Sequence, residues 1–171
     1  MNHASGVPFD AVNAKPHSLP PHAVARGKLL AVVTQNIDGL HQAAGSKRVY
    51  ELHGSVLRNH CMRCGRAFDV DYIRNGEGVP KCPCGGLIKP DVVLYGESLD
   101  GDCISGAVSA IANADLLIVG GTSLTVYPAA GLIDDYRGNR LVLVNKTTTP
   151  RDARADLIIR EPIGKLFAEL P

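Results

Sequence analysis

Residues 28–45 have the sequence KLLAVVTQNIDGLHQAAG, in which an apolar run stops abruptly at a polar turn. The continuous apolar run over 28–34 predicts a buried strand of the parallel type, because such strands are covered on both faces. Residues 37–44 predict a short helix, with Asn36 or Asp38 as its cap. A buried strand that leads through a polar turn into a helix is the repeating unit of an α/β fold.

The rest of the chain continues this alternation of strands and helices. We expect a strand and turn at 49–57, strands at 91–97, 115–120, 140–144 and 156–159, and helices at 101–113, 127–137 and 163–170. The first 27 residues are expected to be irregular, since four prolines interrupt them. The sequence therefore predicts an α/β protein with a parallel sheet and helices on both faces.

Polar or glycine-rich turns follow three of the expected strands: TQNID (34–38), GGTSL (120–124) and VNKTT (144–148). In a parallel sheet the carboxyl ends of the strands meet at one edge, where ligands bind. Each turn alone is explained by the turn-forming tendency of Gly, Thr and Asn. Three such turns at one edge favour a ligand site there.

Four of the five cysteines form two close pairs, Cys61 with Cys64 in CMRCG and Cys82 with Cys84 in CPCGG. Four thiolates with this spacing predict a tetrahedral zinc site. Because cysteine fills every position, no coordination position stays open and the zinc would be structural. It would support residues 58–90, a small zinc-ribbon module too short for a core of its own. Two disulfides are the alternative, which the lack of an export signal disfavours.

The composition limits the classes of partner. The chain has 171 residues, 45% of them hydrophobic, and a formal net charge of +1. So small a charge indicates neither direct nucleic-acid binding nor attraction to an acidic membrane, and no apolar run is long enough to span one. We expect a cytoplasmic protein, because paired metal-binding cysteines suit a reducing compartment. The oligomeric state is not set by the sequence.

Six segments, in their order along the chain, resemble the sirtuins, the NAD-dependent protein deacylases. They are TQNIDGLHQAAG, ELHGS, CMRC with CPC, LIKPDVVLYGE, VGGTSLTVYPA and LVLVNK. The resemblance extends from about Lys28 to the C-terminus. It implies a Rossmann-like NAD-binding domain over 1–57 and 91–171, with the zinc module 58–90 between its two parts.

The resemblance also implies a role for each matching residue. His53, in ELHGS, matches the catalytic histidine of the family. Contacts with nicotinamide and its ribose are implied for Gln35, Asn36, Ile37 and Asp38. Contacts with the phosphates and the adenosine end are implied for Gly121, Thr122, Ser123, Asn145, Lys146, Thr147 and Ile163. Edges that pair with an acyl-lysine protein or peptide are implied at Val92, Val93 and Val126, and zinc ligands at Cys61, Cys64, Cys82 and Cys84.

The implied reaction consumes NAD and transfers no hydride. The acyl-lysine amide oxygen attacks C1′ of the nicotinamide ribose, nicotinamide leaves, and a base then activates a ribose hydroxyl against the acyl carbon. A histidine suits this base because its pKa lies near neutrality. The products would be nicotinamide, deacylated lysine and O-acyl-ADP-ribose.

One part of the family pattern is missing. The resemblance implies a first strand that ends in a glycine-rich turn, GAGxS, followed by GIPDFR, and this chain has no such turn. ASGVPFD (4–10) is similar to part of the second motif but lacks its Arg. An impaired or inactive sirtuin that acts as a zinc-stabilised binding module is therefore the alternative function. A hydride-transfer dehydrogenase would need a G-x-G-x-x-G turn, which is absent.

Overall fold

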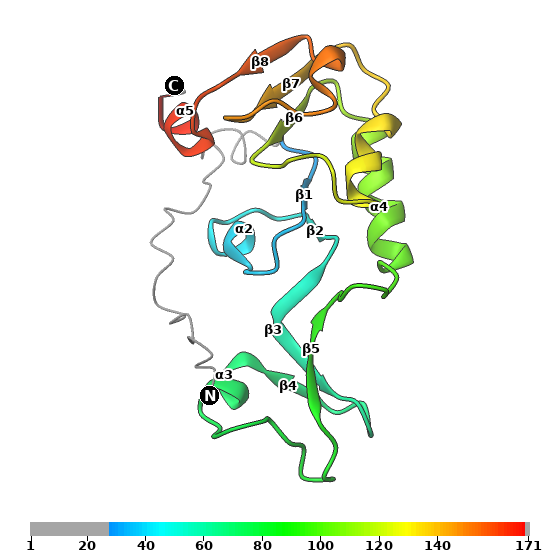
Figure 1. Ribbon diagram of the computed structural model, residues 1–171, viewed down its shortest axis with the longest axis vertical. Helices are drawn as coiled ribbons and strands as arrows, with labels where there is room; N and C mark the ends of the chain where they lie inside the picture. The colour runs from blue at the N-terminus through cyan, green and yellow to red at the C-terminus, as the bar shows by residue number, and fades with distance from the viewer. Residues whose placement is uncertain (1–27, 170–171) are drawn as a thin grey trace, which may run out of the picture.

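The computed structural model describes residues 28–169, and the segment expected to be irregular, 1–27 with its ASGVPFD motif, lies outside this range (Figure 1). The strands are β1 (Val32–Thr34), β2 (Val49–Glu51), β3 (Gly54–Cys61), β4 (Ala67–Asp69), β5 (Ile88–Val92), β6 (Leu117–Gly120), β7 (Leu141–Val144) and β8 (Leu157–Ile159). The α-helices are α2 (Leu40–Ala43), α3 (Val70–Arg74), α4 (Gly101–Ala112) and α5 (Ile163–Glu169), and the 3-10 helices are η1 (Ala129–Asp135) and η2 (Asp152–Arg154).

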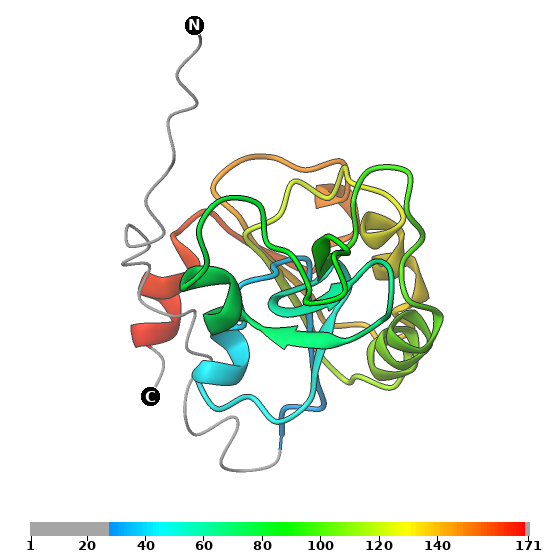
Figure 2. The same cartoon turned by 90° about the horizontal axis from the view of Figure 1, so that it is seen from below.

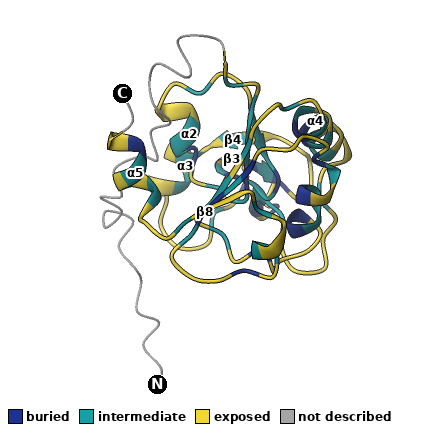
Figure 3. Ribbon diagram, turned by 90° about the horizontal axis from the view of Figure 1, so that it is seen from above, coloured by how far each residue is buried: buried dark blue, intermediate teal, exposed yellow. Residues whose placement is uncertain are grey.

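The predicted α/β class with parallel strands is confirmed, although the strands form two sheets rather than one. β1 pairs with β2 in parallel, and β6, β7 and β8 form a second parallel sheet in that order. Among residues 28–169 no strand is hydrogen-bonded to both sheets. Helices α4 and η1 lie along one side of the second sheet and α5 lies on the opposite side (Figures 1 and 3).

A shared apolar core holds the two sheets together. Val33 of β1 packs against the buried cluster that contains Ile111 of α4 and Leu141 and Leu143 of β7. Burial of these side chains removes apolar surface from water and supplies most of the stabilisation of this part. Figure 3 shows the buried segments gathered between α4 and the strands, with exposed segments outside them.

Helix α4 matches the sequence prediction closely. Asp100 is its N-cap, and its carboxylate accepts a hydrogen bond from the Cys103 amide at 2.7 Å. The expected helix at 127–137 is instead a 3-10 helix, η1. The Gly131 amide donates to the Pro128 carbonyl, three residues back, which is the tighter 3-10 pattern.

Other elements differ from the prediction in length. The strand expected at 28–34 is β1, which is only Val32–Thr34. The helix expected at 37–44 is only α2, and its N-cap is Gly39 rather than the predicted Asn36 or Asp38, although the Asp38 carboxylate accepts from the Leu40 amide at 3.0 Å. The strand expected at 91–97 is β5, which lies earlier in the chain and ends at Val92. Beyond it, the Glu97 carboxylate accepts from the Leu94 amide at 2.9 Å and closes a turn.

The cysteine-rich part lies at one end of the molecule, built on the antiparallel strands β4, β3 and β5 with α3 beside them (Figure 1). In the view from below it faces the reader, with the parallel strands behind it (Figure 2). The predicted division at 58–90 has its boundaries inside β3 and β5, which run from one part into the other. No helix within residues 28–169 is long and apolar enough to cross a membrane.

Replacement of Gly54 by alanine should strongly destabilise the protein. Gly54 has φ of +75°, and a Cβ there would lie 1.7 Å from the Asp91 carbonyl oxygen of the paired strand. We expect Gly54→Ala to lower the free energy of unfolding by more than about 3 kcal/mol, because backbone must move to admit the methyl group. Urea unfolding followed by circular dichroism measures the change.

Gly78→Ala is the matched control for this substitution. Gly78 has a similar φ of +70°, but a Cβ there would meet no atom within 4 Å. We expect Gly78→Ala to lower the free energy of unfolding by only about 1 kcal/mol, the cost of a left-handed backbone at alanine. Equal losses for the two variants would contradict the steric explanation.

Candidate functional site

The imidazole of His53 is anchored by the turn that follows β1. Its Nδ1 lies 3.1 Å from the carbonyl oxygen of Gln35. The neighbouring backbone is fixed as well, since the Leu52 amide donates to the Thr34 carbonyl at 2.9 Å. A carbonyl can only accept, so this contact requires the proton on Nδ1 and leaves Nε2 with a lone pair.

Further backbone hydrogen bonds gather the predicted residues around His53. The Val56 amide donates to the Ile37 carbonyl at 3.0 Å, and the Val93 amide donates to the His53 carbonyl at 3.0 Å. Val92 is the residue paired with Gly54 in the β3–β5 ladder. Five of the predicted positions therefore lie in one cluster, which we call the histidine cluster: Gln35, Ile37, His53, Val92 and Val93.

The polar side chains of the TQNID turn do different things. The Asp38 carboxylate accepts from the Leu40 amide at the start of α2, and the Asn36 amide donates to the Thr34 hydroxyl at 3.0 Å. The side chains of Gln35 and Asn36 make no hydrogen bond within residues 28–169, which leaves two amide groups to contact a ligand. Thr34, which the sequence analysis did not single out, orients this turn through its buried hydroxyl.

A second group of predicted residues, the adenosine-end cluster, lies at the ends of β6, β7 and β8. It contains Gly121, Asn145 and Ile163. The Gly121 amide donates to the Val144 carbonyl at 3.1 Å, and the Asn145 amide donates to the Ile159 carbonyl at 3.0 Å. A Cβ on the neighbouring Gly120 would lie 2.3 Å from Cδ1 of Ile163, so glycine lets α5 approach this turn.

Local hydrogen bonds fix the other predicted residues of this second cluster. The Thr122 hydroxyl accepts from the Leu124 amide at 3.2 Å, and the Ser123 hydroxyl lies 2.6 Å from that of Thr125. The Asn145 side-chain amide donates to the Thr147 carbonyl at 3.0 Å, while Lys146 is exposed. These contacts shape turns and leave the exposed Ser123 and Lys146 side chains at the surface.

The predicted positions are not all brought together. Within residues 28–169 no recorded hydrogen bond joins the histidine cluster to the adenosine-end cluster. Val126 is 49% exposed at the start of η1, where its carbonyl accepts from Ala130 at 2.8 Å. No recorded contact in the described part joins Val126 to Val92 or Val93.

Sequence reasoning missed two charged residues beside the second cluster. Arg160 follows β8, and its guanidinium donates to the carbonyls of Asn145 and Thr147 and to the Asp152 carboxylate. Basic and acidic residues alternate in TPRDARADLIIR (149–160), but this pattern matches no binding motif and so did not point to Arg160 or Asp152.

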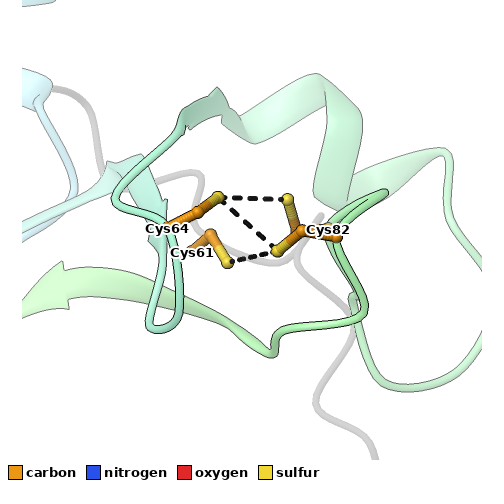
Figure 4. A group of neighbouring side chains, drawn as sticks. Cys61, Cys64 and Cys82 are labelled. Carbon is orange, nitrogen blue, oxygen red and sulfur yellow. Dashed lines mark hydrogen bonds between the residues drawn. The ribbon is translucent and has the colours of Figure 1, made fainter.

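The four paired cysteines lie together as a zinc site requires. Their Sγ atoms all lie within 4.8 Å of one another, with Cys61 3.5 Å from Cys84 and Cys64 3.7 Å from Cys82. Tetrahedral zinc with Zn–S bonds of about 2.3 Å separates its sulfur ligands by about 3.8 Å, so the arrangement fits. Figure 4 shows these sulfur atoms pointing toward one another. All five cysteines are free thiols, which excludes the disulfide alternative in this structure.

The pKa values of two of these thiols are shifted in opposite directions. Burial opposes ionisation of Cys61, but the Cys64 and Arg63 amides and the neighbouring thiols outweigh it and lower its pKa to about 6. The Gly86 amide favours the Cys84 thiolate, yet the thiol contacts with Cys82 and Cys61 raise its pKa to about 12. One thiolate therefore forms readily, and a full set of four needs a bound cation.

His60, next to Cys61, is not part of the sulfur cluster. Its Nδ1 lies 2.5 Å from the Asp91 carboxylate, and Arg58 pairs with Glu51 at 2.8 Å. Both are partly exposed side-chain pairs that link β3 to its neighbours, and each contributes at most about 1 kcal/mol.

Comparison with known proteins gives a consistent result. The model of the Sir2 family matches residues 3–128. An NAD-dependent protein deacetylase of Clostridium acetobutylicum is 62% identical over 144 residues, which cover 83% of this chain and 59% of that protein. The chain thus spans about three fifths of the length of such curated relatives.

Solved structures are similar over most of the described fold. One described as "Sir2-p53 peptide-NAD+" is 41% identical with a TM-score of 0.81, covering 90% of this chain and 66% of the other. Another, of Sir2 with the inhibitor EX-527, 2'-O-acetyl-ADP-ribose and deacetylated p53 peptide, is 40% identical with a TM-score of 0.82 and covers 90% and 68%.

Proposed function

The chain belongs to the Sir2 family, and we propose that it is an NAD-dependent protein-lysine deacylase. The proposed reaction removes an acyl group from lysine, consumes NAD and yields nicotinamide, O-acyl-ADP-ribose and deacylated lysine. The relatives at 55–62% identity are NAD-dependent protein deacetylases, which supports the reaction class.

One observation carries the proposal, the contact between His53 Nδ1 and the Gln35 carbonyl, which favours the tautomer with its proton on Nδ1. A general base needs an unprotonated nitrogen in a set orientation and a pKa near the working pH. The Gln35 carbonyl, 3.1 Å from Nδ1, supplies both the orientation and the tautomer. Nε2 then accepts a proton from the ribose hydroxyl of an NAD-derived intermediate.

The two clusters divide the contacts with NAD between them. In the first, the free side-chain amides of Gln35 and Asn36 face the nicotinamide end, beside Ile37 and Asp38. The second receives the phosphates and the adenosine through its turns: Gly121, Thr122, Ser123, Asn145, Lys146, Thr147 and Ile163. One Asp38 carboxylate oxygen accepts from the Leu40 amide, so the other oxygen is the one offered to the ribose.

An acyl-lysine peptide would bind as an extended strand beside the chain after β5 and before η1. Val92 and Val93 lie directly next to His53 through the Val93 amide, which brings the lysine near the base. Val126 supplies the opposite edge. Backbone hydrogen bonds give such strand addition its affinity.

A zinc ion held by Cys61, Cys64, Cys82 and Cys84 would be structural, as the closed set of four sulfur ligands requires. The same free thiols support the proposal of a cytoplasmic location, where cysteines stay reduced.

A second candidate function is favoured by the separation of the two sheets. No described strand pairs with both β1 and β6, so within residues 28–169 the two sheets meet through side-chain packing rather than through a continuous ladder. Packing alone fixes the two halves of an NAD site less firmly than a shared ladder, which would weaken NAD binding. In that case the protein is a catalytically impaired Sir2 relative that acts as a zinc-stabilised binding module.

Titration with NAD distinguishes the two candidates. We expect isothermal titration calorimetry to detect NAD binding and a coupled assay to detect nicotinamide release only when an acetyl-lysine peptide is present. A matched peptide with unmodified lysine is the control. Zinc-loaded protein that gives neither heat nor nicotinamide would favour the binding module.

A further inference from the structure

We propose that Arg160 and Asp152 are positioning residues that hold the loop 145–149 in the shape that receives the adenosine end of NAD. The inference rests on the proposed function and adds two residues to it. It is carried by a set of contacts that converge on one loop from the end of β8.

The Arg160 guanidinium binds the loop at two carbonyls and also binds Asp152. Its Nη1 donates to the carbonyl of Asn145 at 3.1 Å and to that of Thr147 at 2.7 Å, and Nη2 donates to the Asp152 carboxylate. The planar fork of arginine allows these contacts to be made together, which a lysine cannot reproduce. Arg160 thus joins the chain after β8 to the turn after β7.

Asp152 binds the far end of the loop, and we call Arg160 and Asp152 together the clamp. Its Oδ1 accepts from the Thr149 amide at 3.0 Å and from the Thr149 hydroxyl at 2.7 Å. The Thr149 hydroxyl contact, with Arg160 close by, lowers the pKa of Asp152, so the clamp is ionised at neutral pH. Thr149 itself is buried, which fixes this end of the loop against the core.

The clamp decides which groups the loop can offer to a ligand. The Asn145 and Thr147 carbonyls are occupied by Arg160, and the Asn145 side-chain amide also donates to Thr147. This leaves the side-chain oxygen of Asn145 as an acceptor without a hydrogen-bond partner in the described chain. A ribose hydroxyl of the adenosine can donate to that oxygen only while the loop keeps this shape.

Arg154 offers a matched control. It is an arginine of similar exposure close in sequence, but it pairs with Asp134 of η1 and makes no recorded contact with the loop carbonyls. Arg154→Ala therefore removes an ion pair of the same region without releasing the Asn145 and Thr147 carbonyls.

Two readouts test the positioning role. Hydrogen exchange followed by mass spectrometry should show amides of residues 145–149 exchanging about tenfold faster in Arg160→Ala than in wild type, with no such change in Arg154→Ala. Steady-state kinetics should show the KM for NAD raised about tenfold in Arg160→Ala, with kcat within about twofold. Arg160→Lys should recover part of the KM, because one ammonium can reach one carbonyl.

The results that overturn the inference are distinct from those that overturn the enzyme. Unchanged exchange of residues 145–149 in Arg160→Ala, or a fall in kcat without a rise in KM, rejects the positioning role. Wild-type protein that does not bind NAD rejects the proposed function. In that case hydrogen exchange of residues 145–149 still tests whether Arg160 holds the loop. The proposed role in receiving adenosine is rejected, because the protein binds no NAD.

Discussion

Replacement of His53 by alanine should lower the rate of deacetylation by about 10²- to 10⁴-fold, the range expected when a general base is removed. The imidazole is held by the Gln35 carbonyl at 3.1 Å, and no other side chain within residues 28–169 is recorded at that carbonyl. The variant keeps both amide side chains of the TQNID turn, so NAD affinity should stay within about threefold. Formation of deacetylated peptide and calorimetry measure the two quantities separately.

His60→Ala is the control for the loss of an imidazole. His60 lies on β3 and pairs with Asp91 at 2.5 Å, away from the Gln35 carbonyl. Its removal costs one partly exposed ion pair and should leave the rate within about twofold. A His53→Ala variant that keeps more than a tenth of the wild-type rate contradicts the assignment of the base.

Removal of zinc should unfold the cysteine-rich part and lower the free energy of unfolding by more than about 4 kcal/mol. The buried cluster of this part consists of Cys61, Cys82 and Ile88, and two of those three are themselves proposed ligands. Without the metal, β4 and α3 would depend on the short β3–β4 ladder and on Phe68 and Ile73, which are only partly buried against this small cluster. Metal analysis should find one zinc per chain, and a strong chelator should shift the melting transition downward.

The pH dependence of this effect follows from the acidity of Cys61. Its folded pKa is lowered from 9.0 to about 6, so the thiolate contributes stability that is fully present above pH 9 and is lost as the pH falls through about 6. That pKa belongs to the metal-free thiol, and because protons compete with zinc for the thiolates, the affinity for zinc should fall as the pH is lowered. Cys82→Ser should lose the metal, whereas Cys103→Ser, which alters the one cysteine outside the cluster, should keep it. Equal zinc content in the two variants would contradict the site.

The sequence predicted best those helices and strands that are determined by the pattern of apolar residues within their own segment. The apolar spacing in α4 and the continuous strands β6 and β7 gave elements close to the expected bounds, because burial of one face decides them. The cysteine pairs were equally informative, since four thiols of that spacing have few other uses. The division of the sheet was not predictable, because strand pairing depends on residues far apart in the chain.

The turn after β1 shows where sequence reasoning about the site stops. The pattern TQNID indicated that several polar groups gather there, and the structure gives each a different use. The Asp38 carboxylate accepts from the Leu40 amide, while Gln35 contacts His53 through its backbone carbonyl rather than its side chain. A contact through a backbone carbonyl does not depend on the residue type, so the sequence does not reveal it. The same holds for Arg160, whose guanidinium donates to two backbone carbonyls.

The most direct measurement is product analysis by mass spectrometry after incubation of the zinc-loaded protein with NAD and an acetyl-lysine peptide. The account predicts equal amounts of nicotinamide, deacetylated peptide and O-acetyl-ADP-ribose, with the last two formed about 10²- to 10⁴-fold more slowly in His53→Ala. Free acetate without O-acetyl-ADP-ribose, or no product from a folded protein with one zinc per chain, would contradict it.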